Sequence, residues 1–347
     1  MIRSEIGFGI VGAGMVARYH ATAIERTPGA RLVAICRADR ARAEECAAQF
    51  GVPCLTEYEA LLARNDIQAV CICTPSGLHA EQAIAAARAG KHVLVEKPMA
   101  LTLADADAMI AACEQNGVRL GVALQRRTDP TFQRVYAAVG AGQLGRLVLG
   151  MVSVPYLRAQ SYYDSAAWRG TWALDGGGAL MNQGIHLIDL LLWLMGDGVE
   201  VWASAATLAH AIEVEDCVAA TLRFANGALG SVVATTAAAT GFPHRVEIYG
   251  DRGGLQIEGE QVVRWEGAGR PADEGANIAA APAVTAGAGA SPTGIGAVGH
   301  TRLLADFTNA IRDGRDPLVT GREGRRSLAL VLAIYDSART GQVARPG

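Results

Sequence analysis

The chain has 347 residues, half of them apolar, and this length predicts two domains that each bury a core. Its 31 basic and 34 acidic residues leave a net charge of −3, which argues against a dedicated nucleic-acid-binding protein with a concentrated basic face. Seven scattered cysteines form no compact framework, so we expect reduced thiols and a cytoplasmic protein. We expect no membrane contact, because the longest uncharged run, 275–299, has few large apolar side chains.

The first 125 residues alternate between short apolar runs and alanine-rich helical stretches. Strands are expected at 6–11, 31–36, 69–73, 92–95 and 119–124, and helices at 15–27, 40–50, 77–89 and 102–116. Strands that are apolar on both faces and separated by helices indicate a parallel sheet covered on both sides. We therefore predict an α/β fold over 1–125, a Rossmann domain with a doubly wound parallel sheet.

The pattern changes after Pro130. Helices are expected at 130–141 and 177–195, and strands at 145–155, 199–209, 214–224, 228–237, 244–250, 253–258 and 261–265. Consecutive strands joined by short turns predict an open, mostly antiparallel sheet, so the second domain, 126–320, is expected to be α+β. Low-complexity residues 267–299 are expected to form a surface excursion. Helices at 300–313 and 322–339 follow, and we assign 321–347 to a C-terminal helix and tail.

A glycine-rich turn stands where the first strand meets the first helix. Gly12-x-Gly14-x-x-Ala17 is a dinucleotide-binding fingerprint, in which Gly12 permits the tight turn and Gly14 lets the backbone approach a pyrophosphate. Met15 and Val16 are then the first residues of a helix, and the N-terminal amides of a helix bind anions. The alternative is a glycine-rich turn without function, which is disfavoured by the alternating pattern around it.

The end of the second strand selects the cofactor. Arg37 stands where NAD-binding proteins usually carry a carboxylate for the ribose hydroxyl, and Arg40 is one helical step away. Two guanidinium groups suit a 2′-phosphate, so the sequence favours NADP. NAD remains open, with Arg37 stacking on adenine and Asp39 binding the ribose.

Two further strand ends carry polar residues. Thr74, Pro75 and His79 follow the 69–73 strand, and Glu96-Lys97-Pro98 follows the 92–95 strand. Loops at the carboxyl ends of parallel strands face the ligand crevice, so these residues are expected to bind cofactor. Only Lys91 and Lys97 are lysines, which makes Lys97 in the crevice less easily explained as a surface cation, although that reading stays open. Its ammonium can polarise a carbonyl oxygen and can also lose its proton.

A polar stripe crosses the apolar helix predicted at 177–195. Asn182, His186 and Asp189 lie at i, i+4 and i+7 and share one face of an α-helix. They form either an internal hydrogen-bonded network or the wall of a polar cavity. In the second case, His186 is a candidate for proton transfer. No His, Cys, Asp or Glu set has metal-ligand spacing near the crevice, so no metal is expected.

Together these motifs resemble the Gfo/Idh/MocA oxidoreductases, the glucose–fructose oxidoreductase and inositol 2-dehydrogenase family. The fingerprint, Glu96-Lys97-Pro98 and the Gly176–Asp189 segment GGGALMNQGIHLID carry the resemblance, which covers nearly the whole chain except 267–299. It implies an N-terminal Rossmann domain and a C-terminal domain whose open sheet forms a homodimer or homotetramer. It also implies NAD(P)-dependent hydride transfer at a carbinol carbon of a sugar, inositol or sugar derivative, and a cis Lys97-Pro98 bond.

The resemblance places Lys97 and His186 in the catalytic set. Many inositol-type members carry Asp where this chain has Asn182, and an amide cannot stabilise an imidazolium. We expect His186 to take the hydroxyl proton while Lys97 stabilises the developing alkoxide, with Asn182 beside them. Substrate contacts are expected from aromatic, basic and polar side chains, although core and surface roles are open for them: Tyr156, Arg158, Tyr162, Trp168, Arg169, Asn182, Asp189 and His244.

Two other functions remain alternatives. A regulator could bind the dinucleotide without turnover, but such a chain would be expected to have lost Lys97 or His186. A glycoside-cleaving enzyme could use the same hydride chemistry transiently, with no net consumption of cofactor.

Overall fold

The computed structural model describes residues 5–267 and 297–347, which form two compact units. The Rossmann unit comprises Met1–Thr128 and Gly296–Arg325, and the sheet unit comprises Asp129–Ile295 and Arg326–Gly347. Most of the low-complexity segment expected at 267–299 lies outside the described residues. The two units are described separately below.

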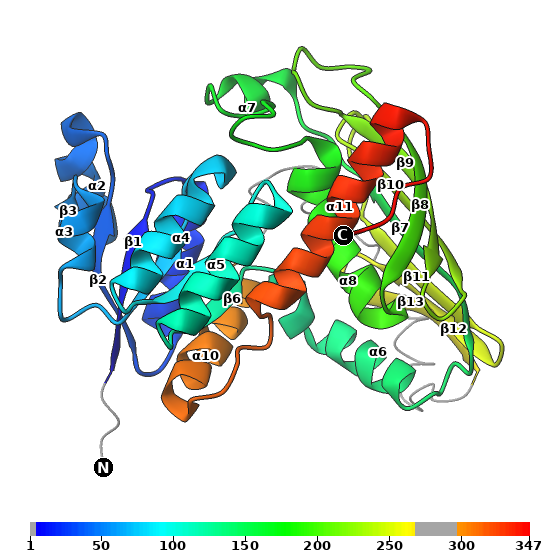
Figure 1. The fold of residues 1–347 in the computed structure, drawn as a ribbon, viewed down its shortest axis with the longest axis horizontal. Helices are drawn as coiled ribbons and strands as arrows, with labels where there is room; N and C mark the ends of the chain where they lie inside the picture. Colours follow the sequence, from blue (N-terminus) through cyan, green and yellow to red (C-terminus); the bar gives the residue numbers. More distant parts are fainter. Residues whose placement is uncertain (1–4, 268–296) are drawn as a thin grey trace. The chain divides into compact units, whose positions relative to one another are not determined.

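The Rossmann unit is built on a parallel sheet, as the sequence predicts, and the sheet has six strands where the sequence indicates five (Figure 1). Its strands are β1 (Ile6–Val11), β2 (Ala30–Cys36), β3 (Cys54–Leu55), β4 (Ala69–Ile72), β5 (His92–Val95) and β6 (Leu120–Val122), in the order β3-β2-β1-β4-β5-β6. Its helices include α1 (Met15–Arg26), α2 (Ala43–Phe50), α3 (Tyr58–Leu62), α4 (His79–Arg88) and α5 (Leu103–Gln115). The strand order reverses between β1 and β4, where open α/β sheets bind ligands beyond the carboxyl ends of the strands.

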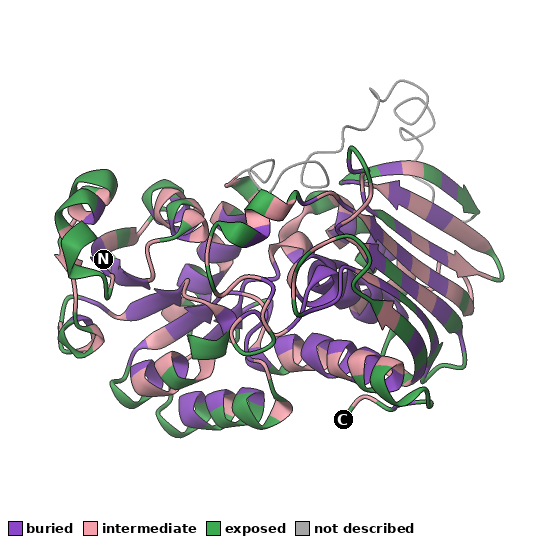
Figure 2. Cartoon of the chain, turned by 90° about the horizontal axis from the view of Figure 1, so that it is seen from above, coloured by how far each residue is buried: buried purple, intermediate pink, exposed green. Residues whose placement is uncertain are grey.

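Burial explains why these segments form parallel strands. Every residue of β1 and β4 is buried, so both faces of the central strands are covered (Figure 2). The short elements β3 and α3 were not predicted, because two and five residues are too few to show a period.

A helix from late in the chain, α10 (Val298–Asp313), belongs to the Rossmann unit and packs on α1. Phe307 is fully buried against Gly121, where a Cβ atom would lie 2.9 Å from the phenyl ring. Arg312 donates to the carbonyl oxygen of Gly29 at 2.8 Å. The sequence-based boundary at 320/321 divides the chain differently, since it leaves this helix in the second domain.

The sheet unit contains a seven-stranded sheet in the order β13-β12-β11-β7-β10-β9-β8. Its strands are β7 (Leu147–Pro155), β8 (Gly198–Ala206), β9 (Cys217–Phe224), β10 (Leu229–Thr235), β11 (Arg245–Gly250), β12 (Gly253–Glu258) and β13 (Gln261–Gly267). All neighbouring strands are antiparallel except β7 and β10, which confirms the mostly antiparallel sheet predicted from the short turns.

Helices cover one face of this sheet. They include α6 (Pro130–Gly140), α7 (Gln160–Asp164), the π-helix η4 (Ala179–Gly184), α8 (Ile185–Met195) and α11 (Gly321–Thr340), whose first residues belong to the Rossmann unit. Helix α8 packs on β7, where Gly150 leaves room for Met195 and Leu191. Buried and more exposed residues alternate along β9 and β10, as expected for a sheet with one covered face (Figure 2). In residues 5–267 and 297–347, no helix combines the length and apolarity needed to cross a bilayer.

The packing of α10 gives a stability prediction. Phe307→Ala removes a fully buried ring and leaves a cavity beside Gly121, so we expect a loss of about 3–5 kcal/mol in the free energy of unfolding. Val298→Ala changes an exposed residue of the same helix and should leave stability within about 0.5 kcal/mol of the unsubstituted protein. Chemical denaturation measures both variants, and equal losses in the two would contradict the assignment of α10 to this core.

Candidate active site

The glycine-rich turn has the geometry of a pyrophosphate cradle. Gly12 has φ +92°, and a Cβ atom there would lie 2.6 Å from the carbonyl oxygen of Cys73, so only glycine fits. At Gly14 a Cβ atom would meet nothing within 4 Å, and this residue precedes α1 without a side-chain cap. The first amides of α1, from Met15 and Val16 onward, therefore begin beside open space, which fits the phosphates of a dinucleotide.

The residues after β2 carry ion pairs. Arg37 lies 3.7 Å from Asp39, and Arg40 pairs with Glu57. Asp39 also accepts a hydrogen bond from the amide of Ala41 at 3.1 Å, which caps a short 3₁₀ turn. The Nε atom of Arg37 is buried and has no hydrogen-bond partner. Both guanidinium groups predicted to select the cofactor thus stand at the end of β2.

His79 fastens two loops at the carboxyl ends of β4 and β5. Its Nδ1 lies 2.8 Å from the carbonyl oxygen of Pro98, and its Nε2 lies 2.9 Å from that of Thr74. Burial lowers the pKa of His79, while the two carbonyl groups favour its protonated form. Pro75 begins the short turn between these contacts. His79 therefore holds the Thr74 and Pro98 loops together.

The two lysines have different environments. The Lys91 ammonium donates to the carbonyl oxygens of Arg64 and Ile67, each at 2.8 Å, and so has a structural role. Lys97 is partly exposed, its amide donates to Glu96 Oε2 at 3.2 Å, and the Lys97-Pro98 peptide bond is cis, as the family resemblance implies. Lys97, the lysine that the sequence predicts to be catalytic, therefore lies on the loop after β5.

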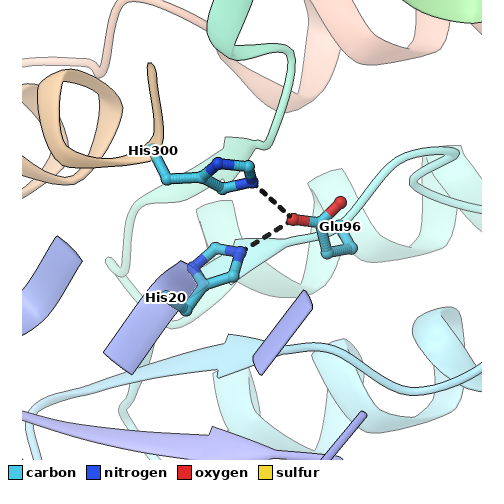
Figure 3. Close-up of side chains that lie close together, drawn as sticks. All are labelled: His20, Glu96 and His300. Carbon is cyan, nitrogen blue, oxygen red and sulfur yellow. Dashed lines mark hydrogen bonds and ion pairs between the residues drawn. The ribbon is translucent and has the colours of Figure 1, made fainter. Parts of the chain in front are cut away.

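Glu96 is the centre of a buried cluster that the sequence did not reveal (Figure 3). Its Oε1 lies 2.7 Å from His20 Nε2 of α1 and 3.6 Å from His300 Nε2 of α10. Burial opposes ionisation of Glu96, but the hydrogen bonds and charges of the histidines lower its pKa well below the usual range. One atom each of His20, Glu96 and His300 could be a metal ligand, and these three atoms lie within 4.8 Å of one another. The 2.7 Å contact between His20 and Glu96 is, however, a hydrogen-bond distance.

In the sheet unit, the predicted polar helix begins as a π-helix. Asn182 lies in η4, whereas His186 and Asp189 lie in α8, and both of these are buried. Asn182 Nδ2 donates to buried Asp175 at 2.7 Å, and Asp189 accepts a hydrogen bond from Ser327 at 2.9 Å. A π-turn inside a helix often marks a functional site.

Glu215 shapes the start of this helix. Its carboxylate accepts hydrogen bonds from the amides of Gly178 and Leu180, both at 2.8 Å, and from the Tyr335 hydroxyl at 3.0 Å. Burial raises the pKa of Glu215 to about 7. No local pattern marked Glu215 or Asp175, since each acts on residues of η4 through the fold.

Most of the predicted substrate residues gather in the sheet unit around Tyr162. The Arg158 and Arg169 guanidinium carbons lie 5.8 and 4.3 Å from the centre of its ring. Arg158 also lies over Tyr156, whose hydroxyl is 3.0 Å from His244 Nδ1. The centre of the Trp168 ring lies 4.6 Å from the Arg169 guanidinium carbon. Asp189 is not among these contacts.

The His20–Glu96 pair predicts acid sensitivity. Burial lowers the pKa of His20 below its ordinary value of 6.5, so the folded state loses stability as pH falls below about 6.5, at most about 1.4 kcal/mol per pH unit. Glu96, whose folded pKa is also lowered, adds a loss below about pH 4.5.

His20→Gln keeps a donor for Glu96 but does not titrate. Its melting temperature should therefore fall less than that of the unsubstituted protein between about pH 7.5 and pH 5.5. Thermal denaturation across this range measures the difference, and parallel curves would show that His20 is not the group responsible.

Comparisons with known proteins agree with the geometry. The model of an oxidoreductase family with an NAD-binding Rossmann fold matches residues 6–124, and that of the GFO/IDH/MocA C-terminal domain matches residues 132–256.

Named relatives cover most of the chain. The 1,5-anhydro-D-fructose reductase of Ensifer adhaerens is 30% identical over 97% of each chain. The inositol 2-dehydrogenase of Rhizobium meliloti is 32% identical over 75% of this chain and 78% of the relative. The WlbA dehydrogenase of Bordetella pertussis, solved with NADH and UDP-GlcNAcA, is 36% identical over 98% of each chain with a TM-score of 0.87. The chain therefore belongs to the Gfo/Idh/MocA family of NAD-binding oxidoreductases.

Proposed function

We propose that the protein is an NAD(P)-dependent dehydrogenase or reductase that acts on a carbinol or carbonyl carbon of a sugar, inositol or sugar derivative. The observation that carries this proposal is Lys97, on the loop after β5 in a unit whose Gly12 turn fits a dinucleotide. Relatives named as an inositol dehydrogenase and an anhydrofructose reductase support the substrate class.

The chain's residues would divide the chemistry as follows. The bound nicotinamide supplies the hydride acceptor or donor. His186 takes the proton of the substrate hydroxyl, and Lys97 stabilises the negative charge that develops on the oxygen. Asn182, fixed by Asp175, offers its side-chain oxygen to a substrate hydroxyl. The proposed dinucleotide contacts are Gly12, Gly14, Met15, Val16, Arg37, Arg40, Thr74, Pro75, His79, Glu96 and Lys97.

We also propose that the protein is a homodimer or homotetramer assembled through the seven-stranded sheet. Trp202 of β8 and Leu229 and Val233 of β10 are large apolar residues that are 52%, 50% and 41% exposed. Apolar side chains on an uncovered sheet face are typical of an interaction surface. Light scattering in solution measures the assembly.

Lys97 gives the principal test of the chemistry. Lys97→Ala removes the proposed oxyanion partner, so we expect turnover to fall about 100-fold or more on a sugar and polyol panel. Lys97→Arg keeps the charge but replaces the compact ammonium by a larger planar guanidinium, and should also be impaired. Absorbance of the reduced nicotinamide follows turnover, and a thermal shift with cofactor shows whether the dinucleotide still binds.

The same assay separates the alternatives. Full turnover in Lys97→Ala would reject the mechanism. No absorbance change with any substrate of the panel would instead favour a dinucleotide-binding regulator. Product formed without net reduction of cofactor would favour glycoside cleavage through transient oxidation.

For the cofactor we propose a preference for NADP, because Arg37 and Arg40 both stand at the end of β2. Their pairs with Asp39 and Glu57 involve exposed carboxylates and can be exchanged for a phosphate at small cost. NADP should therefore raise the melting temperature more than NAD at equal concentration, and Arg37→Ala should remove the difference. A larger shift with NAD would assign Asp39 to the ribose and reject the preference.

A further inference from the structure

The sheet unit places two cations and one anion around a single tyrosine ring. Charged groups that act on the Tyr162 hydroxyl include Arg169, Asp175 and Arg158, two of which are cations. Arg158 is only 4% exposed, and its pKa is lowered by burial, with repulsion from Arg169 adding to the effect. Keeping the buried Arg158 guanidinium on the same ring as the half-buried Arg169 guanidinium is costly unless an anion offsets the charge.

Two polar atoms beside this ring have no hydrogen-bond partner. Arg169 uses its Nη1 to bond the Tyr162 hydroxyl at 2.6 Å, but its Nε is buried and unpartnered. Gln183 also hydrogen-bonds Tyr162, and the Oε1 of this 8% exposed side chain is unpartnered as well. Buried polar atoms are almost always satisfied, so an unpaired donor and an unpaired acceptor on two residues that bond the same tyrosine indicate a missing polar ligand.

The cluster is continuous with the proposed reaction centre of this unit. Gln183 lies in η4 next to Asn182, and Asp175 bonds Asn182 directly. His186 lies in the first turn of α8, which follows η4 directly. A ligand bound at Tyr162 is therefore held by the segment that carries the proposed acid–base residue.

We propose that the Arg158–Tyr162–Arg169 cluster recognises the carboxylate of a sugar acid, so that the substrate of the proposed oxidoreductase is a uronic acid or its nucleotide-linked form. This inference rests on the proposed function. The planar guanidinium of Arg169 matches a carboxylate in geometry, and its buried, unpartnered Nε offers a donor to a carboxylate oxygen. Gln183 offers an acceptor, its unpartnered Oε1, to a sugar hydroxyl.

The test compares acids with neutral partners that differ only at the carboxylate. D-glucuronate is compared with D-glucose and with the methyl ester of glucuronate, and UDP-glucuronate with UDP-glucose. We expect kcat/KM to favour the acid, and Arg169→Gln to lower the acid-to-neutral ratio by about 10- to 100-fold, as for loss of a charge-assisted hydrogen bond. The matched control is Arg264→Gln, which changes an exposed arginine on β13 and should leave the acid-to-neutral ratio unchanged.

Each outcome decides the inference. Equal use of acid and neutral sugar, or an equal loss for both in Arg169→Gln, overturns it. Competition by UDP or pyrophosphate that is weakened in Arg169→Gln and kept in Arg264→Gln assigns the cluster to phosphate and also overturns it. A preference for the nucleotide-linked acid over the free acid supports it and identifies the source of the carboxylate.

If no sugar is turned over, the proposed function fails, and calorimetric titration of the cofactor-loaded protein with glucuronate and UDP-glucuronate still tests the subsite. Binding that is lost in Arg169→Gln and kept in Arg264→Gln supports the cluster as a carboxylate site. No binding of either acid rejects it.

Discussion

The buried carboxylate of Glu96 is the constraint on which the Rossmann unit depends. It accepts hydrogen bonds from His20 of α1 and from the Lys97 amide, and His300 of α10 lies 3.6 Å away. One anion thus connects the helix that carries the dinucleotide turn, the loop of the proposed catalytic lysine, and a helix from 200 residues later in the chain. An ionised carboxylate without these partners could not remain buried, so the contacts fix the three elements together. The position of the Lys97 loop is thus fixed by Glu96, and His79 joins this loop to the Thr74 loop.

The layers of the fold could be predicted because their patterns are local. Buried strands such as β1 and β4 are continuous apolar runs, and their alternation with helices requires parallel crossovers. The antiparallel sheet followed from short turns such as Asn226-Gly227. The return of α10 to the first unit could not be predicted, since its amphipathic pattern shows only that one face is buried. Phe307 fits against Gly121, a residue about 190 positions earlier, and such long-range complementarity leaves no local period.

In the candidate site, too, the features with a local pattern could be predicted and those that depend on long-range contacts could not. Gly12 could be identified because its backbone conformation and its approach to Cys73 exclude any side chain. Only glycine meets this requirement, so the residue type itself marks the position in the sequence. The π-turn of η4 was not identified. The carboxylate of Glu215, from a distant part of the chain, accepts hydrogen bonds from the amides of Gly178 and Leu180 at its start, and no local pattern shows such a contact. An α-helical wheel places Asn182, His186 and Asp189 on one face, and it could not show that the side chain of Asn182 bonds Asp175 or that Asp189 bonds Ser327.

The contact between Asn182 and Asp175 changes the meaning of the amide at this position. An asparagine four residues before the histidine left the sequence without an anion near His186. In the fold a buried carboxylate lies one hydrogen bond beyond that amide, and its second oxygen is bound by the Gly170 amide. The negative charge is therefore present in the segment but held behind a neutral side chain. Such an arrangement fixes the amide orientation, with its oxygen directed away from Asp175, and is compatible with the proton transfer proposed for His186.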